Sequence, residues 1–206
     1  PIVIAGVTGT IITRVYFGDF PAFIIPGQSI VSFWEFPAFA LLGVVCALSA
    51  IIFLRSVEFT SDVISRIPVP QWLKPMGGGL CVGIIALAFP QVLGVGYEAT
   101  DIALNGQYEL AILVALIAAK TAATAICIGA GFGGGVFSPS MFIGAMVGGA
   151  FGIIATQLFP DLSSGHSAYT LVGLGAVSGA VLGAPISTIL IVFELTADYA
   201  LTIAVM

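Results

Sequence analysis

The stretch that decides the fold is Gly129-Ala130-Gly131-Phe132-Gly133-Gly134-Gly135-Val136-Phe137-Ser138-Pro139, in the middle of an uncharged window that runs from residue 121 to residue 160. A single helix over this window would be about 60 Å long, roughly twice the thickness of a bilayer's hydrocarbon core. Glycine weakens helices, so the glycine cluster must break this one. Ser138 suits an N-cap and Pro139 a first helical position. We therefore expect a new helix from about Ser138 to about Phe159.

The composition around this stretch predicts a membrane protein. Of the 206 residues, 59% are hydrophobic and 7% are charged, whereas soluble domains carry about 25% charged residues. The chain therefore lacks the charge to cover a water-facing surface. Ten acidic residues outnumber five lysines and arginines, which excludes a basic nucleic-acid-binding surface. We expect an all-α, polytopic membrane protein in contact with the lipid bilayer, with no nucleic-acid partner.

Other uncharged windows predict further membrane segments. They cover residues 1–13, 36–54, 75–97 and 162–193, the last interrupted only by His166. Helices are also expected at about 110–128 and across 169–196, the latter divided around Gly183-Ala184-Pro185. Segments broken by Gly and Pro are tolerated at membrane depth where protein or water surrounds the backbone, and they commonly line a substrate site. We therefore expect many tilted and broken helices.

The segment between two of these windows predicts the sidedness of the protein. Residues 55–74 carry three positive charges, which outnumber Glu58 and Asp62. We interpret this segment as a loop, and the positive-inside rule places it in the cytoplasm.

Glycines at helix-packing spacing form two series. The first is Gly144, Gly148 and Gly152, and the second is Gly175, Gly179 and Gly183. A stripe of small residues lets another helix backbone approach closely in a membrane. Tight packing within the subunit is the simpler explanation for each stripe, and a dimer contact is the alternative.

The start of the helix after the glycines carries the most specific chemistry. The first turn of a helix has unpaired N–H groups and the positive end of a dipole, roughly half a charge. Without glycine side chains in the way, the amides of Gly135, Val136 and Phe137 can face an anion, beside Ser138. Such partial charges suit an ion that must be held and released. A hinge whose amides meet only water or neighbouring carbonyls is the alternative.

Two motifs resemble one known family. Gly135-Val136-Phe137-Ser138-Pro139 resembles the Gly-x-Phe-x-Pro signature of the CLC chloride channels and chloride–proton antiporters, and Lys120 through Gly134 resembles its glycine-rich approach. Residues 173–188 with Val192-Phe193-Glu194-Leu195-Thr196 resemble a late motif of the same family. Arg14–Asp19 is similar to the end of a mid-protein helix there, so the likeness spans nearly the whole chain.

The resemblance implies a fold, a partner and a site. CLC proteins are homodimers. Each subunit consists of two inverted repeats and has its own anion pathway. Residues 1–54 would then hold the end of the first repeat and the start of the second, and residues 55–206 most of the second, in one partial transmembrane domain. The amides of Val136 and Phe137 would coordinate the central chloride. The subunit contact would lie at about residues 2–16 and 171–196.

The family's remaining anion and gating segments have no counterpart in this sequence. These are a Gly-Ser-Gly-Ile-Pro segment, a glutamate in Gly-Lys/Arg-Glu-Gly-Pro, and an anion-coordinating tyrosine. We therefore expect a piece of a longer membrane domain that does not transport alone. The resemblance implies a voltage-gated type of chloride channel or a chloride–proton antiporter in a plasma or inner membrane. The alternatives are a cation-coupled solute transporter and a membrane-embedded enzyme. A transporter is favoured over an enzyme, because the predicted spans contain no Ser/His/Asp set, His-Glu-x-x-His motif or pair of carboxylates.

The remaining polar residues are interpreted as structural. His166 is expected in a solvated loop, and the acidic residues from Glu98 to Glu109 in a solvated connection. Lys120 and Glu194 border apolar windows, where a charged group is a functional candidate, although a structural role is favoured. The cysteines are expected to be small buried residues: Cys46, Cys81 and Cys127. No metal site or cofactor is expected.

Overall fold

The computed structural model describes residues 2–18, 35–158 and 165–196. Within these ranges all regular structure is helical, which confirms the all-α fold class. The elements are α1 (Ile2–Phe17), α2 (Phe36–Arg66), α3 (Lys74–Ala88), the 3₁₀ turn η2 (Pro90–Val92), α4 (Tyr97–Leu104), α5 (Leu110–Gly129), α6 (Phe137–Leu158), α7 (His166–Leu182) and α8 (Pro185–Thr196). Three of them, α2, α5 and α6, are long and apolar enough to cross a membrane.

The break in the long uncharged window lies where the glycines predict it. Helix α5 ends at Gly129 and α6 begins at Phe137, and Gly131 between them has the left-handed φ of 87° that favours glycine. The N–H of Ser140 donates to the carbonyl of Val136 at 3.0 Å, so Val136 occupies the N-cap position. The predicted N-cap, Ser138, is therefore wrong: this residue lies inside the first turn.

The division of the last predicted helix is also confirmed. Helix α7 ends at Leu182, and the C-cap Gly183 has a φ of 63° and donates its N–H to the Gly179 carbonyl. Helix α8 then begins at Pro185, because proline suits a first helical position.

Two segment boundaries differ from the expectation. Helix α2 continues past Arg55 to Arg66, so most of the expected loop is helical. Arg55 and Glu58, one turn apart, form an exposed ion pair at 3.7 Å. The window 75–97 is not one segment, because α3 stops before Pro90, whose missing N–H and fixed φ start the turn η2.

The prediction of a solvated acidic connection from Glu98 to Glu109 is partly wrong, because part of it is helical. Glu98 and Asp101 lie on α4, a helix of eight residues, while Glu109 is exposed before α5. The cytoplasmic sidedness of residues 55–74, which begin on α2, stays a prediction.

Helices α6 and α7 form the centre of the structure, and the first glycine stripe explains their closeness. A Cβ at Gly144 would lie 2.5 Å from the carbonyl oxygen of Gly173, and one at Gly148 would overlap the carbonyl oxygen of Tyr169. The prediction of tight packing is thus confirmed for this stripe. Its partner on α7 is Gly173, which lies outside the second predicted stripe; Gly179 of that stripe makes only ordinary contacts with the start of α8.

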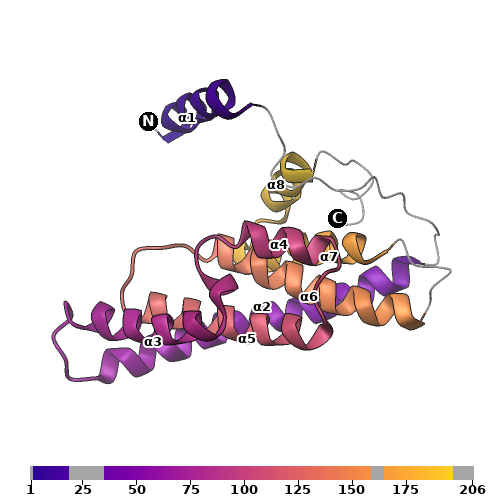
Figure 1. Cartoon of the computed structure of the whole chain (residues 1–206). Coiled ribbons are helices and arrows are strands. Elements are labelled where there is room, and N and C mark those ends of the chain that lie inside the picture. The colour runs from indigo at the N-terminus through magenta and orange to yellow at the C-terminus, as the bar shows by residue number, and fades with distance from the viewer. Residues whose placement is uncertain (1, 19–34, 159–164, 197–206) are drawn as a thin grey trace.

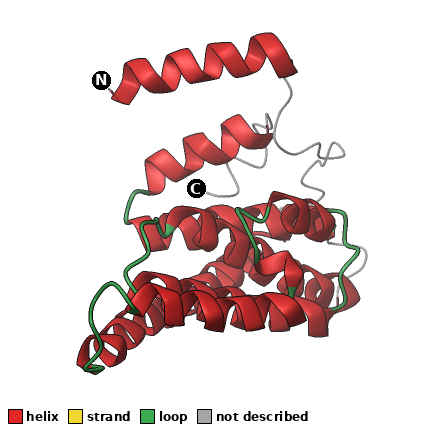
Figure 2. Cartoon of the chain, turned by 60° about the vertical axis from the view of Figure 1, so that its left-hand side comes forward, coloured by secondary structure: helices red, strands yellow, loops and turns green. Residues whose placement is uncertain are grey.

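The other helices surround this central pair (Figure 1). Helices α2 and α5 pack along α6, α3 packs on α5, and α4 packs on α6 and α7. The ring of Tyr169 lies between Phe39 of α2 and Phe151 of α6, at centroid distances of 5.2 and 5.7 Å. Figure 2 shows α1 apart from the main group of helices, whereas α8 contacts this group through α7. Every described side chain of α1 is exposed, although the helix is strongly apolar.

His166 does not lie in a solvated loop, which corrects that expectation. It begins α7, is partly buried, and its Nε2 lies 3.0 Å from the carbonyl oxygen of Ala103. Because a carbonyl only accepts, Nε2 carries the proton in this contact. The hydroxyl of Ser167 donates to the next carbonyl, Leu104, at 2.6 Å. These two side chains connect the start of α7 to the end of α4, where the Ala103 carbonyl also accepts from the N–H of Gly106 at 3.1 Å.

A candidate anion site at the start of helix α6

The backbone at the start of α6 has free hydrogen-bond donors. Across the described ranges, no hydrogen bond begins at the N–H of Gly135, Val136, Phe137 or Ser138. The first N–H groups of any helix lack helical acceptors, and at α6 they coincide with the positive end of a 22-residue helix. The free N–H groups can therefore interact with an anion or with water.

A cavity of about 560 Å³ adjoins these residues. We call it the glycine-loop cavity; its walls are the segment 92–95, one side of α5, the glycine loop and the first turn of α6. Of the candidate site residues, Gly135 and Ser138 line it. Its described lining contains the ammonium-bearing Lys120 and, among the described residues, no carboxylate side chain.

A smaller cavity of about 50 Å³ lies on the other side of Ser138. Phe137 and Ser138 line it, together with Val95, Tyr97 and residues of α6 and α7. About 10–15 Å³ of such volume is enough for one water molecule, so a guest of similar size fits. Val136 lines neither cavity, because its side chain packs against the core between α2, α6 and α7. Ser138 is the candidate residue common to both.

Val95, in the segment 92–95, lines both cavities, and the chain around it is sharply bent. Gly94 and Gly96 have φ values of 66° and 91°, in the left-handed region that favours glycine. The Val95 carbonyl between them accepts a hydrogen bond from the Ser138 hydroxyl at 3.2 Å. A Cβ at Gly96 would overlap the ring of Phe142, so only glycine lets the segment lie this close to α6.

Lys120 holds the same segment from the side of α5. Only 4% of its surface is exposed. Its Nζ donates to the carbonyls of Val92 at 2.7 Å and Gly94 at 2.9 Å, and lies 4.9 Å from the centre of the Phe142 ring. No ion pair of Lys120 with a described residue exists. Lys120 thus has the favoured structural contacts and also places a positive charge in the wall of the cavity. The side chain of Glu194 lies outside the described residues.

The cysteines follow the expectation only in part. Cys46 is buried, but Cys81 is exposed and Cys127 is partly buried in the wall of the glycine-loop cavity. Cys81 is exposed because it lies on a face of α3 that no described helix covers. No group of three potential metal ligands occurs among the described residues.

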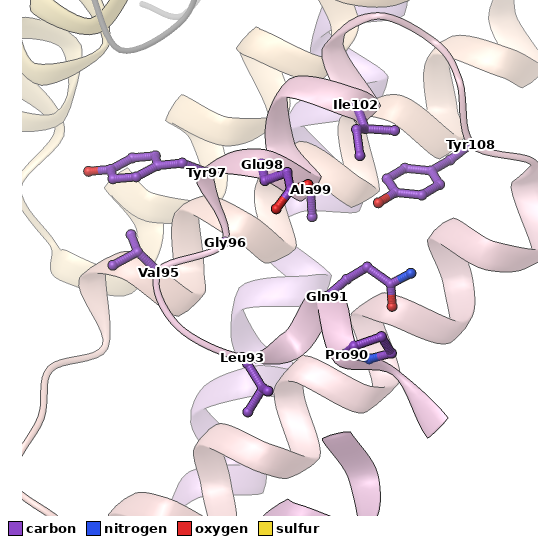
Figure 3. A pocket seen from close by; sticks show the side chains of 10 residues that line it. All are labelled: Pro90, Gln91, Leu93, Val95, Gly96, Tyr97, Glu98, Ala99, Ile102 and Tyr108. Carbon is purple, nitrogen blue, oxygen red and sulfur yellow. The ribbon is translucent and has the colours of Figure 1, made fainter. Parts of the chain in front are cut away.

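A third cavity, of about 630 Å³, lies between η2 and α4. Figure 3 shows the side chains of Gln91, Glu98 and Tyr108 around it. The Tyr108 hydroxyl is buried without a hydrogen-bond partner, and burial together with the nearby Glu98 carboxylate raises the pKa of the phenol. Among the described residues, Val95 lines all three cavities, while Leu93 is shared with the glycine-loop cavity and Tyr97 with the smaller one. No local sequence pattern indicates this cavity, because its polar residues come from three separate segments.

The geometry is that of a membrane protein whose broken helix presents free amides beside a cavity. The chain belongs to the voltage-gated chloride channel family, whose family model matches residues 1–206. It is part of an integral membrane protein of that family.

Individual members of the family are similar to this chain in sequence and in structure. The chain is 33% identical to chloride channel protein CLC-e of Arabidopsis thaliana, over 96% of this chain and 30% of that protein. It is 31% identical to the putative chloride channel protein ClcB-like of Ralstonia nicotianae, over 100% of this chain and 48% of that protein. The crystal structure of a slow cyanobacterial Cl⁻/H⁺ antiporter matches 97% of this chain and 47% of its own, with a TM-score of 0.83 and 26% identity. The chain thus spans about half or less of the length of these relatives.

Proposed function

We propose that this chain forms part of a transmembrane chloride pathway, in a channel or a chloride–proton antiporter. The N–H groups of Gly135, Val136, Phe137 and Ser138 bind the anion at the start of α6. The observation that carries the proposal is that these donors have no acceptor within the described part of the chain. Hydrogen bonds to an ionised acceptor are roughly twice as strong as neutral ones.

The charges around the glycine-loop cavity support an anion rather than a cation. The dipole of α6 and the ammonium of Lys120 are both positive toward this region, and the described part of the lining includes no carboxylate. A cation-coupled transporter would need oxygen ligands for its ion, for which Mg²⁺- and Ca²⁺-type sites use carboxylates and carbonyls. The nearby carbonyls of Val92 and Gly94 are instead occupied by Lys120.

The arrangement of the whole protein is also a proposal. Residues 1–54 complete the first of two inverted repeats and begin the second, and residues 55–206 supply most of the second. The protein is a homodimer in a plasma or inner membrane. Support for a partner at both ends of the chain comes from the exposed apolar side chains of α1 and from Ile186 and Leu190 of α8, which are 75% and 61% exposed.

Halide binding to the full-length protein tests this function. Calorimetry in detergent should detect chloride and bromide binding, and no binding of sodium or of small organic solutes. Liposomes containing the protein should release chloride when the membrane potential is clamped with valinomycin and potassium. Binding or flux of sodium with an organic solute, and none of halide, would replace this proposal by a cation-coupled transporter.

A further inference from the structure

We propose that Lys120 is a positioning residue for the anion site. By donating to two backbone carbonyls, it holds the segment 92–95 in place against α6. The Val95 carbonyl can then accept the hydrogen bond from Ser138 in the first turn of α6. This inference rests on the proposed function. It differs from a purely electrostatic role, in which any positive charge at this place would do.

The contacts form a continuous path from α5 to α6. The Lys120 ammonium donates to the carbonyls of Val92 and Gly94, the residues on either side of Leu93. The next carbonyl, Val95, accepts from Ser138. Gly94 and Gly96, on either side of Val95, both have the left-handed φ that favours glycine, so the bend depends on these two residues. Backbone hydrogen bonds hold the two ends of this bend, from the Leu93 N–H to Pro90 and from the Thr100 N–H to Gly96. Between them, the side chains of Lys120 and Ser138 bond the carbonyls of Gly94 and Val95.

The hydrogen-bonding capacity of Lys120 is directed at the segment. An ammonium has three donors; two are used by the carbonyls, and Nζ also lies 4.9 Å from the centre of the Phe142 ring. The same ring is in contact with the backbone of Gly96. Burying an ammonium is costly without such partners. Lys120 is therefore placed to hold backbone and ring together, and its contacts leave it poorly arranged to bind an anion directly.

Three substitutions separate positioning from charge. Lys120→Met removes both the charge and the donors, Lys120→Gln keeps two N–H donors without the charge, and Lys120→Arg keeps both. In the full-length protein, we expect Lys120→Met to raise the Kd for chloride about tenfold, equivalent to ~1.4 kcal/mol. Lys120→Gln and Lys120→Arg should stay within about threefold of the wild type, since both can still hold a carbonyl. Turnover at saturating chloride should change less than the apparent KM.

A double-mutant cycle tests the path itself. Ser138→Ala removes the hydroxyl that reaches Val95 and should weaken chloride binding by itself. If Lys120 acts through this contact, adding Ser138→Ala to Lys120→Met should cause little further loss, because coupled residues are not additive. Independent, additive effects of the two substitutions would overturn the inference.

Lys74→Met is the matched control, because Lys74 also donates to backbone carbonyls, those of Ile64 and Ser65, away from the segment 92–95. It should leave the Kd for chloride unchanged. If Lys120→Met does not fold, Lys120→Ser, which admits water to the site, takes its place with the same expected loss. Wild-type protein that binds no chloride would refute the proposed function. Wild-type binding with an unchanged Kd in Lys120→Met, or a tenfold loss in Lys120→Gln, would refute the positioning role alone.

Discussion

Replacing Phe137 by proline should weaken chloride binding by about 10- to 150-fold, the equivalent of the 1.5–3 kcal/mol typical of a hydrogen bond to a charged group. Phe137 is the first residue of α6, a position where proline is well tolerated because the N–H has no helical acceptor. The substitution therefore removes the donor that is proposed to hold the anion and leaves the helix in place. Isothermal titration of the full-length protein with chloride measures the loss.

Phe137→Ala is the control that separates the N–H from the ring. It keeps the amide and removes the side chain, which packs against the buried cluster that includes Met141 and Leu174. We expect a lower thermal stability and a Kd for chloride within about threefold of the wild type, because the donor is unchanged. Equal chloride affinities of the proline and alanine variants would show that this amide does not bind the ion.

Replacing Gly148 by alanine should destabilise the protein by about 1–3 kcal/mol or more, as overpacked cores do. A Cβ there would overlap the Tyr169 carbonyl oxygen and lie 2.9 Å from the Cα of Thr170. These are backbone atoms, which cannot rotate away as a side chain can, so α6 and α7 must separate. Since α6 carries the candidate anion site at its start, chloride binding should weaken as well. Thermal unfolding in detergent measures the loss of stability.

Gly83→Ala provides a matched control on another helix. Gly83 lies in α3, and a Cβ there would have no atom within 4 Å. Alanine is a better helix former than glycine by about 1 kcal/mol, so this variant should be as stable as the wild type or more so. A Gly148→Ala variant as stable as Gly83→Ala would mean that the close approach of α6 and α7 is not required.

The large features of the fold follow from strong local signals in the sequence. The glycines between Gly129 and Gly135 cannot continue a helix, and Gly183 followed by Pro185 cannot either, so both breaks were predictable. Helix ends that lack glycine or proline were not predictable in this way. Helix α2 extends through Arg55 because charged residues on its exposed face do not stop a helix, although they do end an apolar window.

The candidate site was predictable only where it is contiguous in the sequence. The run from Gly135 to Ser138 has the composition of an anion-binding helix start, and its N–H groups have no acceptor within the described ranges. That they bind an anion stays a prediction. The contacts of Ser138 and Lys120 with the segment 92–95 join residues 26 to 43 positions apart, so no local pattern indicates them. His166 was misjudged for the same reason, because its acceptor, Ala103, is 63 positions away.

The most direct test of the account is the position of a bound halide in the full-length protein. Crystals grown in bromide and measured at the bromine absorption edge would locate the ion by anomalous scattering. We predict a peak at the start of α6, within hydrogen-bonding distance of the backbone nitrogens of Val136 and Phe137. Bromide bound elsewhere in the pathway, with these nitrogens bonded to protein oxygens, would contradict it.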